Sequence, residues 1–284
     1  MKHKVKLIGA SIDACAGTKG TGDTPDILTR DGWLKPLGLE FEKVVYYTGG
    51  RHDIPKLEHF FTELADITQD AILNKQFPII IGGDHSCAIG SWSGIATGLK
   101  DQTYGLIWLD AHLDAHTPED SESGNIHGMP VAALMGEGYP EFVNILTKNP
   151  KLDPKNIIFI GIRSYEASEK ERIERLGIKV YYTEEVGERG FIEVFDEAWN
   201  ELSHRVDKIG LSIDLDGFDP EYAPGVGTPA HDGINFDDCI KALSKIDNSK
   251  LTGLEITECN DHFDPSGKTT KCVIDLIKTV LKID

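Results

Sequence analysis

Eight short apolar runs recur along the chain, and several of them are apolar at nearly every position. Strands that bury both faces read as continuous apolar runs, as in parallel sheets covered by helices on both sides. We therefore predict strands at residues 5–8, 44–47, 77–81, 104–109, 157–160, 180–182, 209–213 and 251–256.

The segment between the second and third predicted strands has a helical period. Its apolar residues form one stripe at i, i+3, i+4 and i+7 spacing, which is typical of a helix that packs on a core. These residues are Leu57, Phe60, Phe61, Leu64, Ile67, Ala71 and Ile72. Strands that alternate with helices predict an α/β protein, with a three-layer α/β/α fold around a mostly parallel sheet.

No stretch rich in proline, glycine or serine and no charge block divides the chain, and we find no internal repeat. We therefore predict a single domain over residues 1–284. The glycine-rich segment 17–22 matches neither the P-loop nor the dinucleotide-binding motif. We interpret it as a loop near the entrance of a site.

Charge and composition restrict the classes of partner. The chain has 29 Lys and Arg against 47 Asp and Glu, so its net charge is −18, which repels nucleic acid and anionic lipid. No apolar run approaches the roughly 18 residues of a membrane span. The five cysteines show no paired close spacing, and the first residues lack a signal-like apolar region. We expect a reduced, cytoplasmic protein without a nucleic-acid or membrane partner.

Acidic and imidazole side chains follow three predicted strands directly. His85 follows the strand at 77–81, Asp110 begins a segment after the strand at 104–109, and Asp214 begins another after the strand at 209–213. Ligands of open α/β sheets bind beyond the carboxyl ends of the strands. These three strand ends therefore predict one functional site.

The residue types in these segments favour a site for metal ions. If the backbone stays extended, the period-2 spacing points the side chains of each segment the same way. Four carboxylates at one sheet edge repel one another, and cations relieve that repulsion. The candidate ligands are His85, Asp110, His112, Asp114, Asp214 and Asp216. This set is too large for one tetrahedral zinc and suits two divalent ions.

The same three segments, in this order, resemble the signatures of the arginase/agmatinase ureohydrolase family, and the resemblance covers nearly the whole chain. It implies a two-manganese centre that hydrolyses a guanidinium group of a small-molecule substrate. By this resemblance one manganese would be held by His85, Asp110, Asp114 and Asp214. The other would be held by Asp110, His112, Asp214 and Asp216, so that two aspartates bridge the ions.

The segment after Asp114 resembles the loop by which arginases contact the amino-acid end of their substrate. The run Ser123-Gly124-Asn125 and the nearby His127 keep the spacing of that loop. The resemblance implies that Ser123 and Asn125 bind substrate and that His127 shuttles protons. The agmatinase-like members lack this arrangement, so L-arginine is the expected substrate.

The chain departs from that pattern at two positions that the resemblance also assigns to substrate. His116 stands where arginases typically have asparagine, and Glu166 stands where they usually have an aspartate that meets the α-amino group. Either difference changes the amino-acid end of the pocket.

One of the metal ligands and two further residues are expected to act in the reaction. Asp114 would both bind metal and orient the attacking water. Glu258 stands where the resembled family keeps an acid that pairs with the guanidinium, and a carboxylate matches that planar fork. Thr228, in a loop after the strand at 209–213, would offer a hydroxyl to the substrate. Without the resemblance, a solvated Glu258 and a turn residue at Thr228 are ordinary interpretations.

Other interpretations stay open. A related hydrolase of agmatine, guanidinobutyrate or formiminoglutamate would keep all six metal ligands and change only the pocket. A metal-binding regulatory protein without catalysis would need neither His127 nor Glu258. Manganese, cobalt and nickel all accept mixed nitrogen and oxygen ligands. We expect two Mn²⁺ ions per chain and a homo-oligomer.

Overall fold

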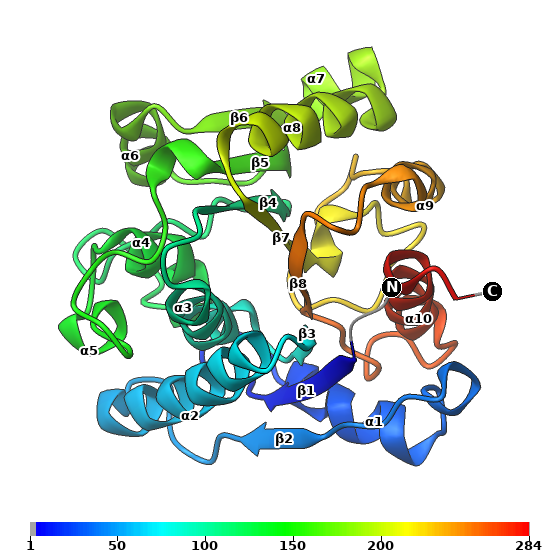
Figure 1. Cartoon of the computed structure of the whole chain (residues 1–284), viewed down its shortest axis with the longest axis horizontal. Coiled ribbons are helices and arrows are strands. Elements are labelled where there is room, and N and C mark those ends of the chain that lie inside the picture. Colours follow the sequence, from blue (N-terminus) through cyan, green and yellow to red (C-terminus); the bar gives the residue numbers. More distant parts are fainter. Residues whose placement is uncertain (1–3, 284) are drawn as a thin grey trace.

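The structure is a computed structural model that describes residues 4–283. Its strands form one sheet of eight, in the order β2-β1-β3-β8-β7-β4-β5-β6 (Figure 1). They are β1 (Val5–Ser11), β2 (Lys43–Tyr46), β3 (Phe77–Gly82), β4 (Tyr104–Leu109), β5 (Ile157–Ile162), β6 (Lys179–Tyr182), β7 (Lys208–Asp214) and β8 (Leu251–Thr257). All pairings between these strands are parallel. The predicted strands and the α/β class are confirmed; residues 1–3 and 284 of the predicted domain lie outside the described part.

Helices cover both faces of the sheet. They are α1 (Thr24–Arg30), α2 (Ile54–Leu73), α3 (Ala88–Leu99), α4 (Pro130–Met135), α5 (Pro140–Val143), α6 (Ala167–Leu176), α7 (Thr183–Arg189), α8 (Phe191–Arg205), α9 (Phe236–Lys245) and α10 (Lys268–Leu281). One layer holds α2 to α6, and the other holds α1 and α7 to α10 (Figure 1). The predicted apolar stripe of residues 57–72 lies on α2. None of the helices in residues 4–283 has the length and apolar character of a membrane span.

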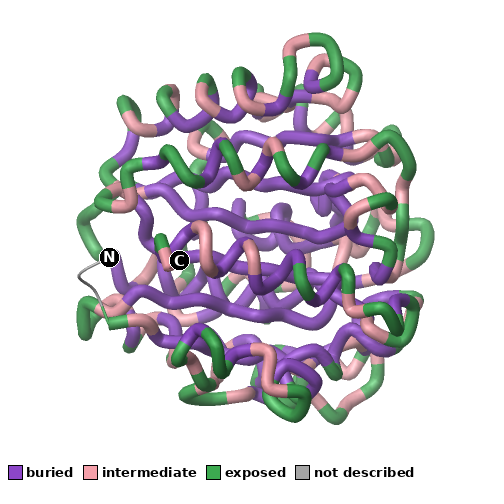
Figure 2. The backbone as a smooth tube through the Cα atoms, turned by 90° about the vertical axis from the view of Figure 1, so that its right-hand side faces the viewer, coloured by how far each residue is buried: buried purple, intermediate pink, exposed green. Residues whose placement is uncertain are grey.

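The sheet separates two hydrophobic cores. Successive side chains of a strand point to opposite faces. On β3, for example, Ile79 and Ile81 pack in one core and Ile80 packs in the other. Figure 2 shows buried backbone through the middle of the molecule and exposed residues on the outer turns. Because both faces of the central strands are buried, these strands are mostly apolar, and the candidate metal ligands gather at the strand ends.

A glycine sets the distance between α2 and α3. A Cβ atom on Gly94 of α3 would lie 2.1 Å from the Ala65 carbonyl oxygen and 2.1 Å from Thr68 Oγ1, both on α2. A methyl group therefore does not fit unless the helices move apart. This contact fixes α3, which follows directly after the segment that carries His85.

We expect Gly94→Ala to lower the free energy of unfolding by about 1–3 kcal/mol, the usual cost of overpacking a core. Gly187→Ala is the matched control, because Gly187 also lies in a helix but a Cβ atom there meets nothing within 4 Å. That control should leave stability unchanged or raise it by up to about 1 kcal/mol. Urea unfolding of the two variants measures both effects, and equal midpoints would contradict the close-packing argument.

Candidate active site

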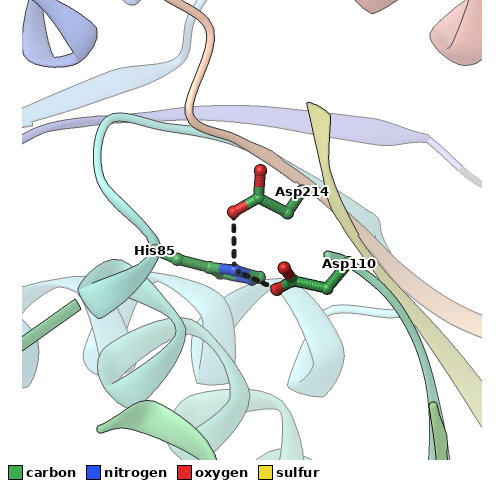
Figure 3. A group of neighbouring side chains, drawn as sticks. All are labelled: His85, Asp110 and Asp214. Atoms are coloured by element: carbon green, nitrogen blue, oxygen red, sulfur yellow. Dashed lines mark ion pairs between the residues drawn. The ribbon is translucent and has the colours of Figure 1, made fainter. Parts of the chain in front are cut away.

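The candidate metal ligands lie at the carboxyl ends of β3, β7 and β4, and β8 lies between β3 and β7 in the sheet. His85 begins a short 3₁₀ turn after β3, Asp110 follows β4 directly, and Asp214 is the last residue of β7. Because all four strands are parallel, their carboxyl ends meet at one edge of the sheet. Residues 85, 110 and 214, far apart in sequence, therefore lie together (Figure 3).

The first group of ligands surrounds one imidazole nitrogen. His85 Nδ1 lies 3.2 Å from Asp110 Oδ2, 3.1 Å from Asp114 Oδ2 and 3.1 Å from Asp214 Oδ2. The His85 ring is fully buried, and Nδ1 makes no well-aligned hydrogen bond to any group in the described residues. A buried nitrogen that faces three carboxylate oxygens fits a metal ligand.

The second group lies beside the first and shares one carboxylate with it. His112 Nδ1 is 3.2 Å from Asp216 Oδ2 and 3.5 Å from Asp110 Oδ1. Asp110 therefore faces both imidazoles with its two oxygens. The structure thus brings all six predicted ligands into two adjoining groups, which is the donor set expected for two divalent ions.

Crowding disfavours the charged form of most of these carboxylates. Burial and the charges of Asp216 and Asp110 raise the pKa of Asp214 well above its usual value, and burial is also the main cause that raises the pKa of Asp114 to about 6. Burial opposes ionisation of Asp110 as well, but its contacts with His112 and His85 hold its pKa below the usual range. Positive charge at this position relieves the repulsion, so the site fits the metal ions that the donor set implies.

The backbone of these segments does not stay extended. Strand β4 ends at Leu109, β7 ends at Asp214, and Asp114 adopts a left-handed conformation with φ +49°. The side chains converge because each segment turns. Asp110 Oδ1 accepts a hydrogen bond from the backbone N–H of His112 at 2.7 Å, and Asp214 Oδ1 accepts one from Asp216 at 2.8 Å. Such Asx turns bring residues i and i+2 to the same side.

Glu258 joins the metal groups to the predicted proton shuttle. It follows β8 with φ +64°, and its Oε1 accepts hydrogen bonds from the backbone N–H of His85 at 2.9 Å and from His127 Nδ1 at 3.1 Å. Burial opposes protonation of His127, but this contact with Glu258 raises the His127 pKa to about 9. The other oxygen, Oε2, is buried without a donor in the described chain.

A cavity of about 410 Å³ opens above these groups. All of the predicted substrate residues line it: His116, Ser123, Asn125, Glu166 and Thr228. So do His112, Asp114 and His127, which face it from the metal end. Gly17 and Thr18 of the glycine-rich segment also line this cavity, as expected for a loop at its entrance.

Glu169 is a buried carboxylate of this cavity that the sequence analysis missed. It accepts hydrogen bonds from the backbone N–H groups of Ala115 at 3.1 Å and Glu166 at 3.0 Å. Its Oε2 also lies 3.2 Å from His116 Nε2. Burial opposes protonation of His116, but Glu169 and Asp120 raise its pKa to about 9. The spacing Glu166-x-x-Glu169 at the start of α6 is a capping box, and that pattern could have drawn attention to Glu169.

The amino-acid sequence is similar to those of known proteins over nearly its whole length. The family model described as Arginase family matches residues 3–282. The arginase of Brevibacillus brevis is 35% identical over 298 residues, which cover 99% of this chain and 98% of the relative. The arginase of Bacillus caldovelox is 39% identical over 293 residues, which cover 96% of each chain.

Solved structures agree with these sequence matches. The native structure of the Bacillus caldovelox arginase has a TM-score of 0.93 and 31% identity, and the match covers 99% of both chains. The formimidoylglutamase of Bacillus subtilis has a TM-score of 0.81 at 20% identity, and the match covers 99% of this chain and 86% of that chain. This second likeness shows a shared fold alone.

Proposed function

This chain belongs to the arginase family, and we propose that it hydrolyses the guanidinium group of L-arginine to ornithine and urea with two Mn²⁺ ions. The observation that carries the proposal is the continuity of the 410 Å³ cavity, which is lined by Asp114 and His127 as well as by Ser123 and Asn125. One substrate can therefore reach the metal groups with one end and the polar loop with the other.

The two ions would be held by the ligand groups around His85 and His112. When bound, divalent ions lower the pKa of a water molecule and supply a nucleophile at neutral pH. Glu258 would bind and orient the guanidinium, since its unpaired Oε2 can accept from that group. Asp114 would accept a hydrogen bond from the attacking water and aim it at the guanidinium carbon.

His127 would supply the proton that the leaving amine needs. Its ring lines the cavity and its Nδ1 is hydrogen-bonded to Glu258, which keeps the imidazole protonated near neutral pH. A positioned imidazole that can exchange protons with solvent is suited to this role.

We expect L-arginine to exceed agmatine in kcat/KM by about 10²-fold or more, because polar groups built to meet a substrate carboxylate stay unpaired with a substrate that lacks it. The motivating groups are the Ser123 hydroxyl and the Asn125 amide N–H, which can both donate to a carboxylate and belong to residues that line the cavity. Urea release from a panel of guanidino compounds, with metal content measured on the same sample, tests this. Faster hydrolysis of agmatine or guanidinobutyrate would contradict the assignment to arginine.

One observation favours a second candidate, a hydrolase of a related guanidino or formimino compound. Both ring nitrogens of His116 face carboxylates: Nδ1 lies 3.3 Å from Asp120 Oδ1, and Nε2 lies 3.2 Å from Glu169 Oε2. Both ring nitrogens of His116 are therefore engaged by neighbouring carboxylates. The amide of an asparagine at this position would be free to donate a hydrogen bond to the substrate. The same substrate panel distinguishes the two candidates.

A further inference from the structure

A fully buried carboxylate lies inside the sheet, away from the cavity. Glu255 is on β8, and its Oε1 accepts from Ser91 Oγ at 2.5 Å and faces Cys87 Sγ at 3.6 Å. Its Oε2 accepts from Trp92 Nε1 at 2.7 Å and from Ser212 Oγ at 2.8 Å. Trp92 Nε1 can only donate, and the two hydroxyls and the thiol also point at the carboxylate, so both of its oxygens act as acceptors.

Ser212 connects this carboxylate to a metal ligand. Its Oγ lies between Glu255 Oε2, at 2.8 Å, and His85 Nε2, at 3.0 Å. A serine hydroxyl carries one proton, and the carboxylate can only accept, so that proton points at Glu255. Ser212 Oγ is then left to accept from His85, and the His85 proton must lie on Nε2.

The position of this proton decides what the other ring nitrogen can do. A neutral imidazole with its proton on Nε2 has a lone pair on Nδ1. Nδ1 is the atom that faces Asp110, Asp114 and Asp214. The ring plane is fixed as well, because Trp108 stacks on it with a centroid distance of 4.3 Å and an interplanar angle of 13°.

We propose that Glu255 is a positioning residue of the metal centre, which acts through Ser212 to hold the His85 proton on Nε2 and thereby keeps Nδ1 as a ligand. The inference rests on the metal centre of the proposed function. Hydrogen bonds that orient ligating histidines typically change metal affinity by about 10–100-fold when they are removed. Glu255 touches neither the cavity nor the carboxylates that line it, so its effect should appear in metal binding.

The test compares two serines that donate to the same carboxylate. Ser212→Ala breaks the link between Glu255 and His85, whereas Ser91→Ala removes an equivalent buried hydroxyl from the other oxygen of Glu255 and leaves the link intact. Titration of the metal-free proteins with Mn²⁺, with free Mn²⁺ measured by electron paramagnetic resonance, gives the dissociation constants. Thermal unfolding of the same metal-free samples measures the purely structural cost of each change.

We expect Ser212→Ala to weaken one of the two Mn²⁺ sites by about 10–100-fold, while Ser91→Ala binds like the wild type. Similar thermal stability of the two variants would show that the difference comes from the link to His85. Equal loss of Mn²⁺ affinity in both variants, or no loss in either, would overturn the proposal.

Glu255→Gln separates action through Ser212 from a direct effect of charge, because Glu255 Oε2 is also 3.9 Å from His85 Nε2. If Glu255 acts through Ser212, Glu255→Gln lowers Mn²⁺ affinity in the wild type but adds little in the Ser212→Ala background. An equal effect in both backgrounds would contradict that route.

A wild-type protein that binds Mn²⁺ but cleaves no guanidino compound would refute the proposed activity alone, and one that binds no Mn²⁺ would refute the metal centre.

Discussion

Replacing Asp214 with alanine is expected to remove bound metal and to abolish hydrolysis together. Asp214 Oδ2 lies beside His85 Nδ1, and by the family resemblance the residue would ligate both ions, so a single substitution should weaken both sites. Metal ions stabilise such transition states by several kcal/mol, which corresponds to about 10³-fold or more in rate. Elemental analysis of the purified protein and a urea-release assay on the same sample measure the two losses.

Misfolding should not explain this result. The raised pKa of Asp214 indicates that burial and the neighbouring Asp216 and Asp110 disfavour its charge, so the metal-free variant should unfold at the same temperature as the wild type or higher. Asp219→Asn is the matched control, because Asp219 lies on the same loop but its carboxylate accepts from backbone N–H groups, among them those of Glu221 and Gly233. An Asp214→Ala protein that retains two ions would disprove the shared-ligand assignment.

Replacing His127 with asparagine is expected to keep both metal ions and to lower kcat by about 10²–10⁴-fold, the usual contribution of a general acid or base. An asparagine amide can still donate to Glu258, but it cannot transfer a proton to the leaving amine. Steady-state kinetics and metal analysis of the same sample distinguish this result from the loss of metal. Added imidazole should restore part of the rate, because a free imidazole can replace the missing ring.

The control for this variant is His262→Asn. His262 also pairs with a carboxylate, 2.8 Å from Asp23, but it is exposed and does not line the cavity. It should keep wild-type kinetics. Unchanged turnover in His127→Asn would show that His127 is only a loop residue.

The strands were predictable because buried parallel strands have a simple sequence pattern. Runs such as 157–160 are apolar on both faces, and their short length favours strands over buried helices. The ligands were predictable for a related reason, since polar side chains that directly follow such runs must lie at one sheet edge. Both the apolar run and the polar residues that follow it can be recognised within a few consecutive positions of the sequence.

The features that were missed depend on contacts between distant residues or on backbone turns. The left-handed conformations of Asp114 and Glu258 correspond to no recognisable sequence pattern, because non-glycine residues adopt this conformation only where the surrounding structure holds them. Ser212 and Glu255 stood inside predicted strands as isolated polar residues. Their burial requires hydrogen-bond partners, which only the arrangement of neighbouring strands identifies.

The separation between metal ligands and substrate-facing residues has a consequence for how the specificity of this protein can change. The ligands His85, Asp110 and Asp214 are held by strand ends and buried turns, whereas Ser123 and Glu166 lie on surface segments that tolerate substitution and insertion. Selection can therefore exchange one guanidino compound for another by remodelling these segments while the catalytic chemistry is inherited unchanged. For protein engineers, the segment 116–125 is the place to randomise, with His127 and the strand ends kept constant.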